Sequence, residues 1–315
     1  VVLSGEWDYD PTWNPVWDVD IAFNDSGWTA EFKLPFAVFQ FENKPDMEWG
    51  IEFERSIHRL QERVGWPGRS KSIRGLILPL GVLSGINNIP TPKQLEVIPY
   101  GLTGYSDKTH GNIGLDMRYG LTSNSIMKLT FNPDFGQVEA DPSVLNLTAF
   151  ETFYEERRPF FSEGSEFFSH RISLFNSRRI GRRPNYNIPD DGELEGLPEY
   201  TTILGASRIM GSTSSGINYG FIGALTAEES AIHVDSLGAR NKLVVEPMTN
   251  YSIGRIEVPM INKVSRFGIM TTNVSRENNP GANVVGADWA LGFYDNRMYT
   301  SGQLIQSNTN DIIGN

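Results

Sequence analysis

The sequence predicts an all-β protein: a partial β-sandwich, then the first strands of an antiparallel outer-membrane β-barrel, with a short helical or irregular segment inside it. Apolar and polar residues alternate within residues 1–60 and again from residue 96 onward, which is the period of a strand with two different faces. Within the later region, residues 130–164 combine acids, arginines and phenylalanines. That mixture predicts a segment held inside a polar enclosure, where charges pair and aromatic rings fill gaps.

The change of pattern along the chain divides it into three regions. We expect residues 1–60 to belong to a β-sandwich and residues 61–95 to be a loop-like connector, since Gly and Pro recur there. Residues 96–315 are predicted to form strands of a barrel, with residues 142–170 as a segment in its lumen. Since the chain starts Val1-Val2 without Met, we expect it to be a fragment of a longer protein.

The first region alternates clearly in residues 28–34, with Trp28, Ala30, Phe32 and Leu34 on one face. Residues 49–55 repeat the pattern, and Trp49, Ile51 and Phe53 are expected to point inward. One buried and one wet face are typical of an antiparallel sheet in a sandwich.

The later region contains alternating runs of about nine or ten residues, the length of a tilted membrane-spanning strand. The larger apolar faces are formed by Ile113, Leu115, Met117, Tyr119 and Leu121, by Ile217, Tyr219, Phe221 and Leu225, and by Val285, Ala287, Trp289, Leu291 and Phe293. The opposite positions collect small and polar residues, which favours a wet lumen. Rings at the membrane edges are expected from Tyr219, Tyr251, Trp289, Tyr294 and Tyr299. A soluble β-domain shows the same alternation and stays the alternative.

The centre of the chain carries four consecutive charges followed by Pro159-Phe160-Phe161. In a lumen, arginine forks would hold carboxylates, whereas a solvated helical face is the plainer interpretation. The predicted luminal charge network consists of Glu155, Glu156, Arg157, Arg158, Arg178, Arg179 and Arg182.

Composition excludes several classes of function. The 315 residues hold 27 Lys and Arg against 38 Asp and Glu, a net charge of −11, which argues against nucleic acid as a partner. The absence of cysteine removes disulfides and thiol nucleophiles. No HExxH, GxSxG or phosphate-loop motif occurs, and no pair of acids stands out as a catalytic dyad. We therefore assign no catalytic residue.

Two weaker site predictions concern the N-terminal region. Closely spaced carboxylates offer hard oxygen ligands for calcium, the one cofactor considered; they are Asp8, Asp10, Asp18 and Asp20. Flat aromatic rings beside acids suit stacking on sugar rings, and the candidates are Trp7, Trp13 and Trp17. The alternative for Trp17 is packing beneath the sheet.

Parts of both regions resemble known families. GWTAEFKLPF at Gly27–Phe36 and WGIEFER at Trp49–Arg55 resemble the closing strands of family-nine-like carbohydrate-binding domains. TFNPDFGQVEAD from residue 130, EERRPFF from residue 155 and SRRIGR from residue 177 resemble a bacterial outer-membrane barrel family of uncharacterised function, in which the barrel follows such a domain. The resemblance implies that residues 1–60 are the C-terminal part of the sandwich and that residues 96–315 are the N-terminal part of the barrel. It implies no catalytic residues.

The expected function is therefore glycan binding or uptake, without catalysis, at the outer membrane of a Gram-negative bacterium. The expected partners are a polysaccharide or oligosaccharide and outer-membrane lipid. The alternative is a secreted carbohydrate-active enzyme or accessory module in polysaccharide breakdown, with glycoside hydrolase activity. Recovery of the protein in the membrane or in the soluble fraction separates the two.

Overall fold

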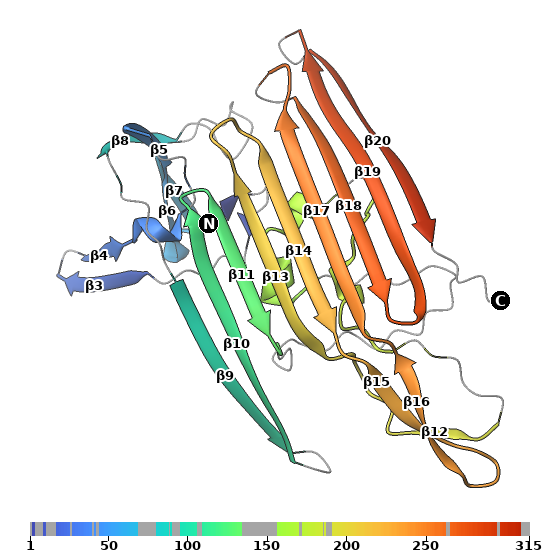
Figure 1. The fold of residues 1–315 in the computed structure, drawn as a ribbon. Coiled ribbons are helices and arrows are strands. Elements are labelled where there is room, and N and C mark those ends of the chain that lie inside the picture. Colours follow the sequence, from blue (N-terminus) through green and yellow to red (C-terminus); the bar gives the residue numbers. More distant parts are fainter. Residues whose placement is uncertain are drawn as a thin grey trace. The chain divides into compact units, whose positions relative to one another are not determined.

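The computed structural model describes residues 2–3, 9–10, 17–25, 27–39, 41, 44–68, 80–87, 89, 95–105, 109–133, 156–169, 172–184, 186, 191–262, 265–294 and 297–309. The chain divides into two compact units: Val1–Lys93 with Thr122–Asn124, and Gln94–Leu121 with Ser125–Asn315. The predicted all-β class is confirmed (Figure 1). Within the described ranges, no helix is long and apolar enough to cross a membrane.

The second unit is built on a nine-stranded antiparallel sheet, in the order β20-β19-β18-β17-β14-β13-β11-β10-β9 (Figure 1). Most neighbours follow each other along the chain, so short turns set the register. The strands are β9 (Leu95–Tyr105), β10 (Thr109–Thr122), β11 (Ser125–Phe131), β13 (Ile203–Ser212), β14 (Asn218–Thr226), β17 (Thr249–Pro259), β18 (Arg266–Arg276), β19 (Asn279–Phe293) and β20 (Met298–Thr309).

One face of this sheet, which we call the covered face, packs against residues 156–169 and 172–180, the inner segment. The inner segment contains α1 (Pro159–Ser162) and the 3-10 turns η3 (Ser165–Phe168) and η4 (Ser177–Arg179). The shared core consists of Phe161, Phe168, Ile180, Ile203, Ala206, Ile222, Ala224, Tyr251, Ile253 and Met270. The small-residue face predicted for residues 218–226 is therefore the buried one, because small side chains leave room for the inner segment.

The opposite face, which we call the open face, carries apolar side chains in solvent. One row of paired residues crosses five strands: Tyr219, Ile256, Ile269, Ala287 and Leu304. Within this row Ile269 is 49% and Leu304 is 68% exposed. A polar row of Ser252, Asn273, Asn283 and Asn308 lies nearer the other end of these strands. The open face thus has an apolar band with a polar border.

One sequence prediction about this sheet is wrong. Tyr251 was expected at an aromatic girdle, but its side chain is buried in the core of the covered face. The reason is parity: Tyr251 shares the covered face with Ile253 and Arg255, because alternate residues of β17 point to one side.

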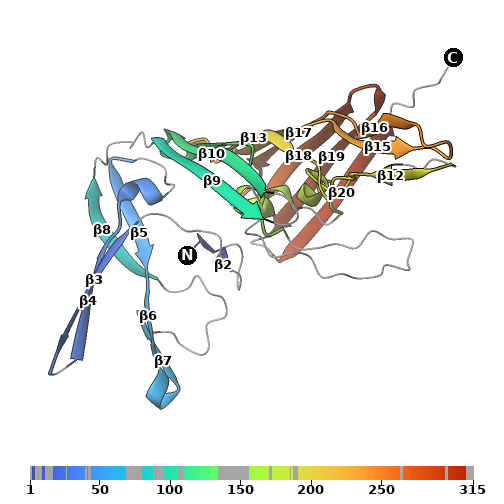
Figure 2. The ribbon, with the colours of Figure 1, turned by 90° about the horizontal axis from the view of Figure 1, so that it is seen from below.

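A smaller three-stranded sheet consists of β12 (Glu193–Glu195), β15 (Glu229–Val234) and β16 (Arg240–Glu246) (Figure 2). In the chain, β12 precedes β13, whereas β15 and β16 lie between β14 and β17. The turn between β15 and β16 is fixed by Asp235, whose Oδ1 accepts hydrogen bonds from the backbone N–H groups of Leu237 and Ala239. This is the usual way in which an Asp side chain closes a turn.

The first unit contains two-stranded antiparallel sheets and the turns η1 (Phe36–Val38) and η2 (His58–Leu60). The pairs are β1 (Val2–Leu3) with β2 (Tyr9–Asp10), β3 (Asp18–Asn24) with β4 (Gly27–Lys33), β5 (Asp46–Ile51) with β8 (Gly81–Asn87), and β6 (Phe53–Ile57) with β7 (Glu62–Trp66). β7 and β8 lie in the region expected to be a loop-like connector. Gln61, with a left-handed φ of 53° at the end of η2, precedes β7.

The predicted burial is wrong for residues 28–34, whereas Trp49 and Ile51 are half-buried as expected of an inward face. Trp28 and Phe32 lie on one face of β4 and Leu34 follows it, yet Phe32 is 54% exposed and the other two are similarly accessible. Phe53 is exposed as well. The physical reason is that a two-stranded ribbon buries an apolar face only where a second layer covers it.

Candidate functional site

The inner segment is held together by Arg158, whose side chain is 93% buried. Its guanidinium donates from Nε to Glu156 Oε1 at 2.8 Å and from Nη2 to Glu156 Oε2 at 2.7 Å. It also donates to the carbonyl oxygens of Ile180 and Ser177, each at 2.7 Å. Arg158 therefore links the beginning of the segment to its end, in the bidentate geometry that makes arginine–carboxylate pairs strong.

The carboxylate of Glu156 is also saturated with hydrogen bonds. Ser177 Oγ donates to Oε2 at 2.6 Å, and the backbone N–H of Arg158 donates to Oε1 at 2.9 Å. Burial alone raises the pKa of the Glu156 carboxyl. The hydrogen bonds and charge of Arg158, with the Ser177 bond, outweigh burial and hold that pKa below its usual value of 4.5. Glu156 is thus charged at neutral pH.

The sheet holds the inner segment through a second arginine, Arg208 of β13. Its Nη1 donates to the carbonyl oxygen of Phe160 at 2.7 Å and to that of Glu163. Its Nη2 lies 3.2 Å from Glu163 Oε2, and Lys128 of β11 pairs with the same oxygen. Two cations on neighbouring strands therefore meet one carboxylate of the inner segment (Figure 1).

A third arginine, Arg255 of β17, lies further along the covered face. Its Nη2 is 3.0 Å from Asp288 Oδ1 and 3.3 Å from Glu257 Oε2. Glu257 Oε1 is 3.5 Å from Arg266 Nε. The Nε and Nη1 groups of Arg255 are buried and have no hydrogen-bond partner, an arrangement that costs free energy.

Each of these arginines also faces a phenylalanine of the inner segment. The distance from Cζ to the ring centroid is 4.4 Å for Arg158 over Phe161, 5.6 Å for Arg208 over Phe160 and 5.4 Å for Arg255 over Phe167. Cations over ring faces within about 6 Å attract electrostatically. One of these cation–π contacts lies within the run at residues 155–161, and the other two join arginines of the sheet to the inner segment.

Glycines of the sheet make space for the inner segment. A Cβ at Gly220 would lie 2.7 Å from Phe168 Cζ and 2.8 Å from Phe167 Cδ1. A Cβ at Gly286 would lie 3.7 Å from Leu174 Cγ and closer still to its Cδ1. Since real Cβ atoms do not approach within 3.0 Å, Gly220 fits only because it lacks one.

The members of the predicted charge network have different positions. The structure brings together Glu156 and Arg158, whereas Arg157 is exposed. The carbonyl oxygens of Arg179 and Arg182 accept hydrogen bonds from Tyr251 Oη at 3.5 Å and from Thr201. The backbone N–H of Arg178 donates to Asn176 Oδ1. Glu155 lies outside the described residues.

Most of the predicted N-terminal sites cannot be placed by their side chains. Trp7, Trp13 and Asp8 lie outside the described residues, and of Asp10 only the backbone is described, in β2. The remaining candidates are exposed. Trp17 stacks on Phe32 with centroids 5.9 Å apart, Asp18 lies 3.9 Å from Lys33, and Asp20 Oδ1 accepts from the backbone N–H of Ile21. Within the described ranges no group of three or more His, Cys, Asp or Glu gathers as a metal site.

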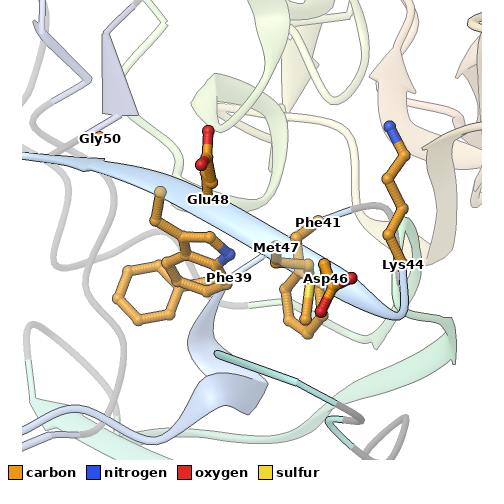
Figure 3. A pocket seen from close by; sticks show the side chains of 8 residues that line it. Phe39, Phe41, Lys44, Asp46, Met47, Glu48 and Gly50 are labelled. Atoms are coloured by element: carbon orange, nitrogen blue, oxygen red, sulfur yellow. The ribbon is translucent and has the colours of Figure 1, made fainter. Parts of the chain in front are cut away.

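The first unit contains an open pocket of about 660 Å³ along β5 (Figure 3). Trp49 lies among Phe36, Phe39 and Phe41, with ring centroids 5.3–5.7 Å apart. Figure 3 shows Glu48 pointing away from the side of β5 on which Phe39 and Met47 lie. The full lining is Phe39, Phe41, Lys44, Asp46, Met47, Glu48, Trp49 and Gly50. Aromatic rings can pack on the C–H faces of a polyhydroxylated ligand, and carboxylates and an ammonium group can hydrogen-bond its hydroxyls, so this lining suits such a ligand.

Sequence reasoning missed Lys128, Arg208, Arg255 and Glu163. Each of the three cations occupies a strand position whose neighbours two residues away are on the covered face. A charge that follows a small or apolar residue by two positions (Ile126, Ala206 and Ile253) was the available signal. It was passed over because a single charge in a strand is less conspicuous than the run at residues 155–158.

The fold and these contacts define an all-β protein with a two-faced sheet, whose covered face holds an arginine-pinned segment. The chain belongs to the family described as a domain of unknown function, DUF5916, which matches residues 91–314. That match contains the nine-stranded sheet and the inner segment. Neither a curated protein nor a solved structure gives a match to the chain.

Proposed function

We propose that this chain is part of an outer-membrane β-barrel protein of a Gram-negative bacterium, with a carbohydrate-binding-like region, and that it binds or takes up glycans without cleaving them. The single observation that carries the proposal is the difference between the two faces of the nine-stranded sheet. Apolar side chains occupy the exposed face, and buried ion pairs lie beside the hydrophobic core on the covered one. A soluble sheet with one covered face typically keeps its open face polar and its charges in water.

The size of the apolar band supports contact with lipid. On the open face of β19, the positions from Val285 to Phe293 are Val285, Ala287, Trp289, Leu291 and Phe293. This span measures about 26 Å at a rise of ~3.3 Å per residue. At the tilt of about 35–45° that barrel strands have, this span covers roughly 20 Å of an apolar band that is about 25 Å tall.

An exposed tyrosine lies at one end of this band: Tyr294, in the turn between β19 and β20. Tyr299 is exposed as well, but it pairs with Gly292 and therefore lies on the same side of the sheet as Asp288. Exposed tyrosines next to apolar strand residues are typical of the interface between lipid and water. In the proposed barrel the turn between β19 and β20 lies at a membrane surface.

The polar chemistry of the covered face supports an interior role. Arg208, Arg255 and Lys128 project there from separate strands and pair with acids. Charged residues in a membrane protein face the interior of the protein, because their burial in lipid is costly. In the proposed barrel the covered face is the wall of the lumen, and the inner segment lies inside.

The pocket along β5 is the proposed glycan contact of the first unit. Its half-buried Trp49 offers apolar ring surface, while Asp46 and Lys44 offer groups that hydrogen-bond hydroxyls. Trp49→Ala in the intact protein should reduce retention on immobilised polysaccharide. Trp66→Ala is the matched control, because Trp66 lies on β7 outside this pocket. Equal losses in both variants would remove the pocket from the proposal.

Fractionation of cells expressing the full-length gene product tests the location. We expect the protein in the outer-membrane fraction, released by detergent and not by salt or carbonate. Recovery in the soluble or secreted fraction would contradict the proposal and favour the carbohydrate-active enzyme or accessory module. Polysaccharide hydrolysis assays would then follow.

A further inference from the structure

The inner segment is attached to the sheet by side chains. Arg208 donates to the carbonyl oxygens of Phe160 and Glu163, and Gln303 bonds to both the N–H and the carbonyl of Ile172, at 3.0 and 3.2 Å. Within residues 156–169 and 172–180, the backbone–backbone hydrogen bonds join residues of the segment to each other. The strands pair with strands. The segment can therefore leave the covered face without breaking any strand ladder.

The segment also carries its own internal tie. Arg158 binds Glu156, Ser177 and Ile180, and all four residues belong to the segment. Its ends are thus joined whether or not the sheet is in contact. A segment whose ends are bonded to each other, and which is bonded to the sheet only through side chains, can move as one rigid body.

The docked arrangement leaves polar groups unsatisfied at the contact. Nε and Nη1 of Arg255, under the ring of Phe167, and Oγ of Ser162 are buried without hydrogen bonds. Buried N–H groups of a charged side chain are costly when unpaired, and water would satisfy them once the segment moves. When the segment leaves the sheet, hydrogen bonds from water to these groups therefore recover part of the free energy that is lost. An interface without unpaired groups would not recover it.

We propose that the inner segment is a releasable plug: docked, it closes the covered face, and released, it exposes the charged strip of Arg255, Glu257 and Asp288 to solute. This inference rests on the proposed barrel, since the strip lines a path only where the covered face is a lumen. The strip presents one guanidinium and two carboxylates, groups that hydrogen-bond a polyhydroxylated solute.

A reversible lock provides the direct test. Residues 1–315 contain no cysteine, and Leu174 of the segment contacts Gly286 of β19, so Leu174→Cys with Gly286→Cys places two thiols within reach of a disulfide. The full-length double variant, reconstituted in liposomes, is assayed for entry of a small oligosaccharide before and after reduction. We expect entry to be at least about tenfold slower in the oxidised form, as a shift between closed and open populations requires. Equal entry in both redox states would overturn the plug.

The barrel itself is checked in the same samples. A heat-dependent change of gel mobility in both redox states, together with equal entry, rejects the plug and leaves the barrel intact. If heating does not change the gel mobility of the wild-type protein, the barrel is rejected, and the plug is rejected with it. The two failures are therefore distinguishable.

Thiol labelling gives a second measurement that needs no transport. Met270 of β18 is fully buried under the segment, so a thiol in Met270→Cys reacts with a hydrophilic maleimide only after release. Adding Arg208→Gln should accelerate labelling about tenfold, because bonds from a charged donor to the segment are lost. Arg240→Gln is the control, since Arg240 pairs with Glu195 in the small sheet. Equal rates for the Arg208 and Arg240 variants would overturn the proposal.

Discussion

Arg158 and Glu156, two residues apart in the chain, form a buried two-point ion pair with donor–acceptor distances of 2.8 and 2.7 Å. The same guanidinium reaches the carbonyl oxygens of residues 177 and 180. An ion pair between residues so close in sequence restricts the chain very little by itself. Its effect on the fold comes from the additional hydrogen bonds of Arg158 to residues 177 and 180, which join the two ends of the inner segment.

Replacing Arg158 should be far more damaging than replacing its neighbour. Arg158→Ala leaves Glu156 charged and buried without its partner, a change that typically costs about 3–5 kcal/mol. Arg157→Ala alters an exposed residue and should cost about 1 kcal/mol or less. The temperature at which gel mobility changes, measured for both full-length variants, checks this. Equal shifts in the two would contradict the role given to Arg158.

Acid should weaken the inner segment through Glu156. Its pKa is lowered in the folded protein, so its contribution to stability is fully present above the ordinary value of 4.5 and is lost as the pH falls through the lowered value. Glu156→Gln removes this titration, so the free energy of unfolding of the variant should change less between neutral and acid pH than that of the wild type. The measurement is denaturant unfolding at a series of pH values. Identical slopes for wild type and variant would refute the assignment.

Adding one methyl group at Gly220 should disturb the docked segment. A Cβ there lies within 2.8 Å of atoms of Phe167 and Phe168, and such overpacking costs about 1–3 kcal/mol. Gly254→Ala is the matched control on β17, where the new Cβ would be 3.7 Å from Thr271 Cγ2, an ordinary contact. Melting temperatures of the two variants report the difference. A Gly220 variant as stable as the Gly254 variant would show that the segment does not pack there.

A charge in the apolar band of the open face should prevent stable insertion if lipid lies against it. Ile269→Arg should cost about 2–4 kcal/mol if the position lies near the bilayer centre, whereas an arginine introduced near the border of the band should cost about 0–1 kcal/mol. Ser275→Arg, on the same face of β18 and exposed, is the border control. The fraction of protein that resists carbonate extraction measures the effect. Equal resistance of both variants would be evidence against lipid contact.

The sequence was most informative where strand parity decided the structure. The division of residues 217–226 and 285–293 into larger apolar and smaller polar faces is observed, because successive side chains of a strand must point to opposite sides. The prediction failed for Tyr251 because it was assigned to a girdle by residue type, without regard to parity. Its neighbours Ile253 and Arg255 share its face and its burial.

The contacts of the site depended on information that the local sequence lacks. Glu156 and Arg158 stood out because they occur in a run of charges. Arg208 and Glu163 are 45 residues apart, and their pairing depends on how the inner segment folds back on β13. The exposure of the β3–β4 hairpin has a similar cause. Its apolar face was predictable from alternation, whereas burial depends on a second layer that no local pattern specifies.

The measurement that tests the central claim most directly is the gel mobility of the full-length protein, purified in detergent, with and without boiling. A closed barrel resists unfolding in detergent at room temperature, so we predict a compact, fast-migrating band that shifts to the full mass only after heating. A single band of unchanged mobility, from protein that is folded by circular dichroism, would contradict the barrel.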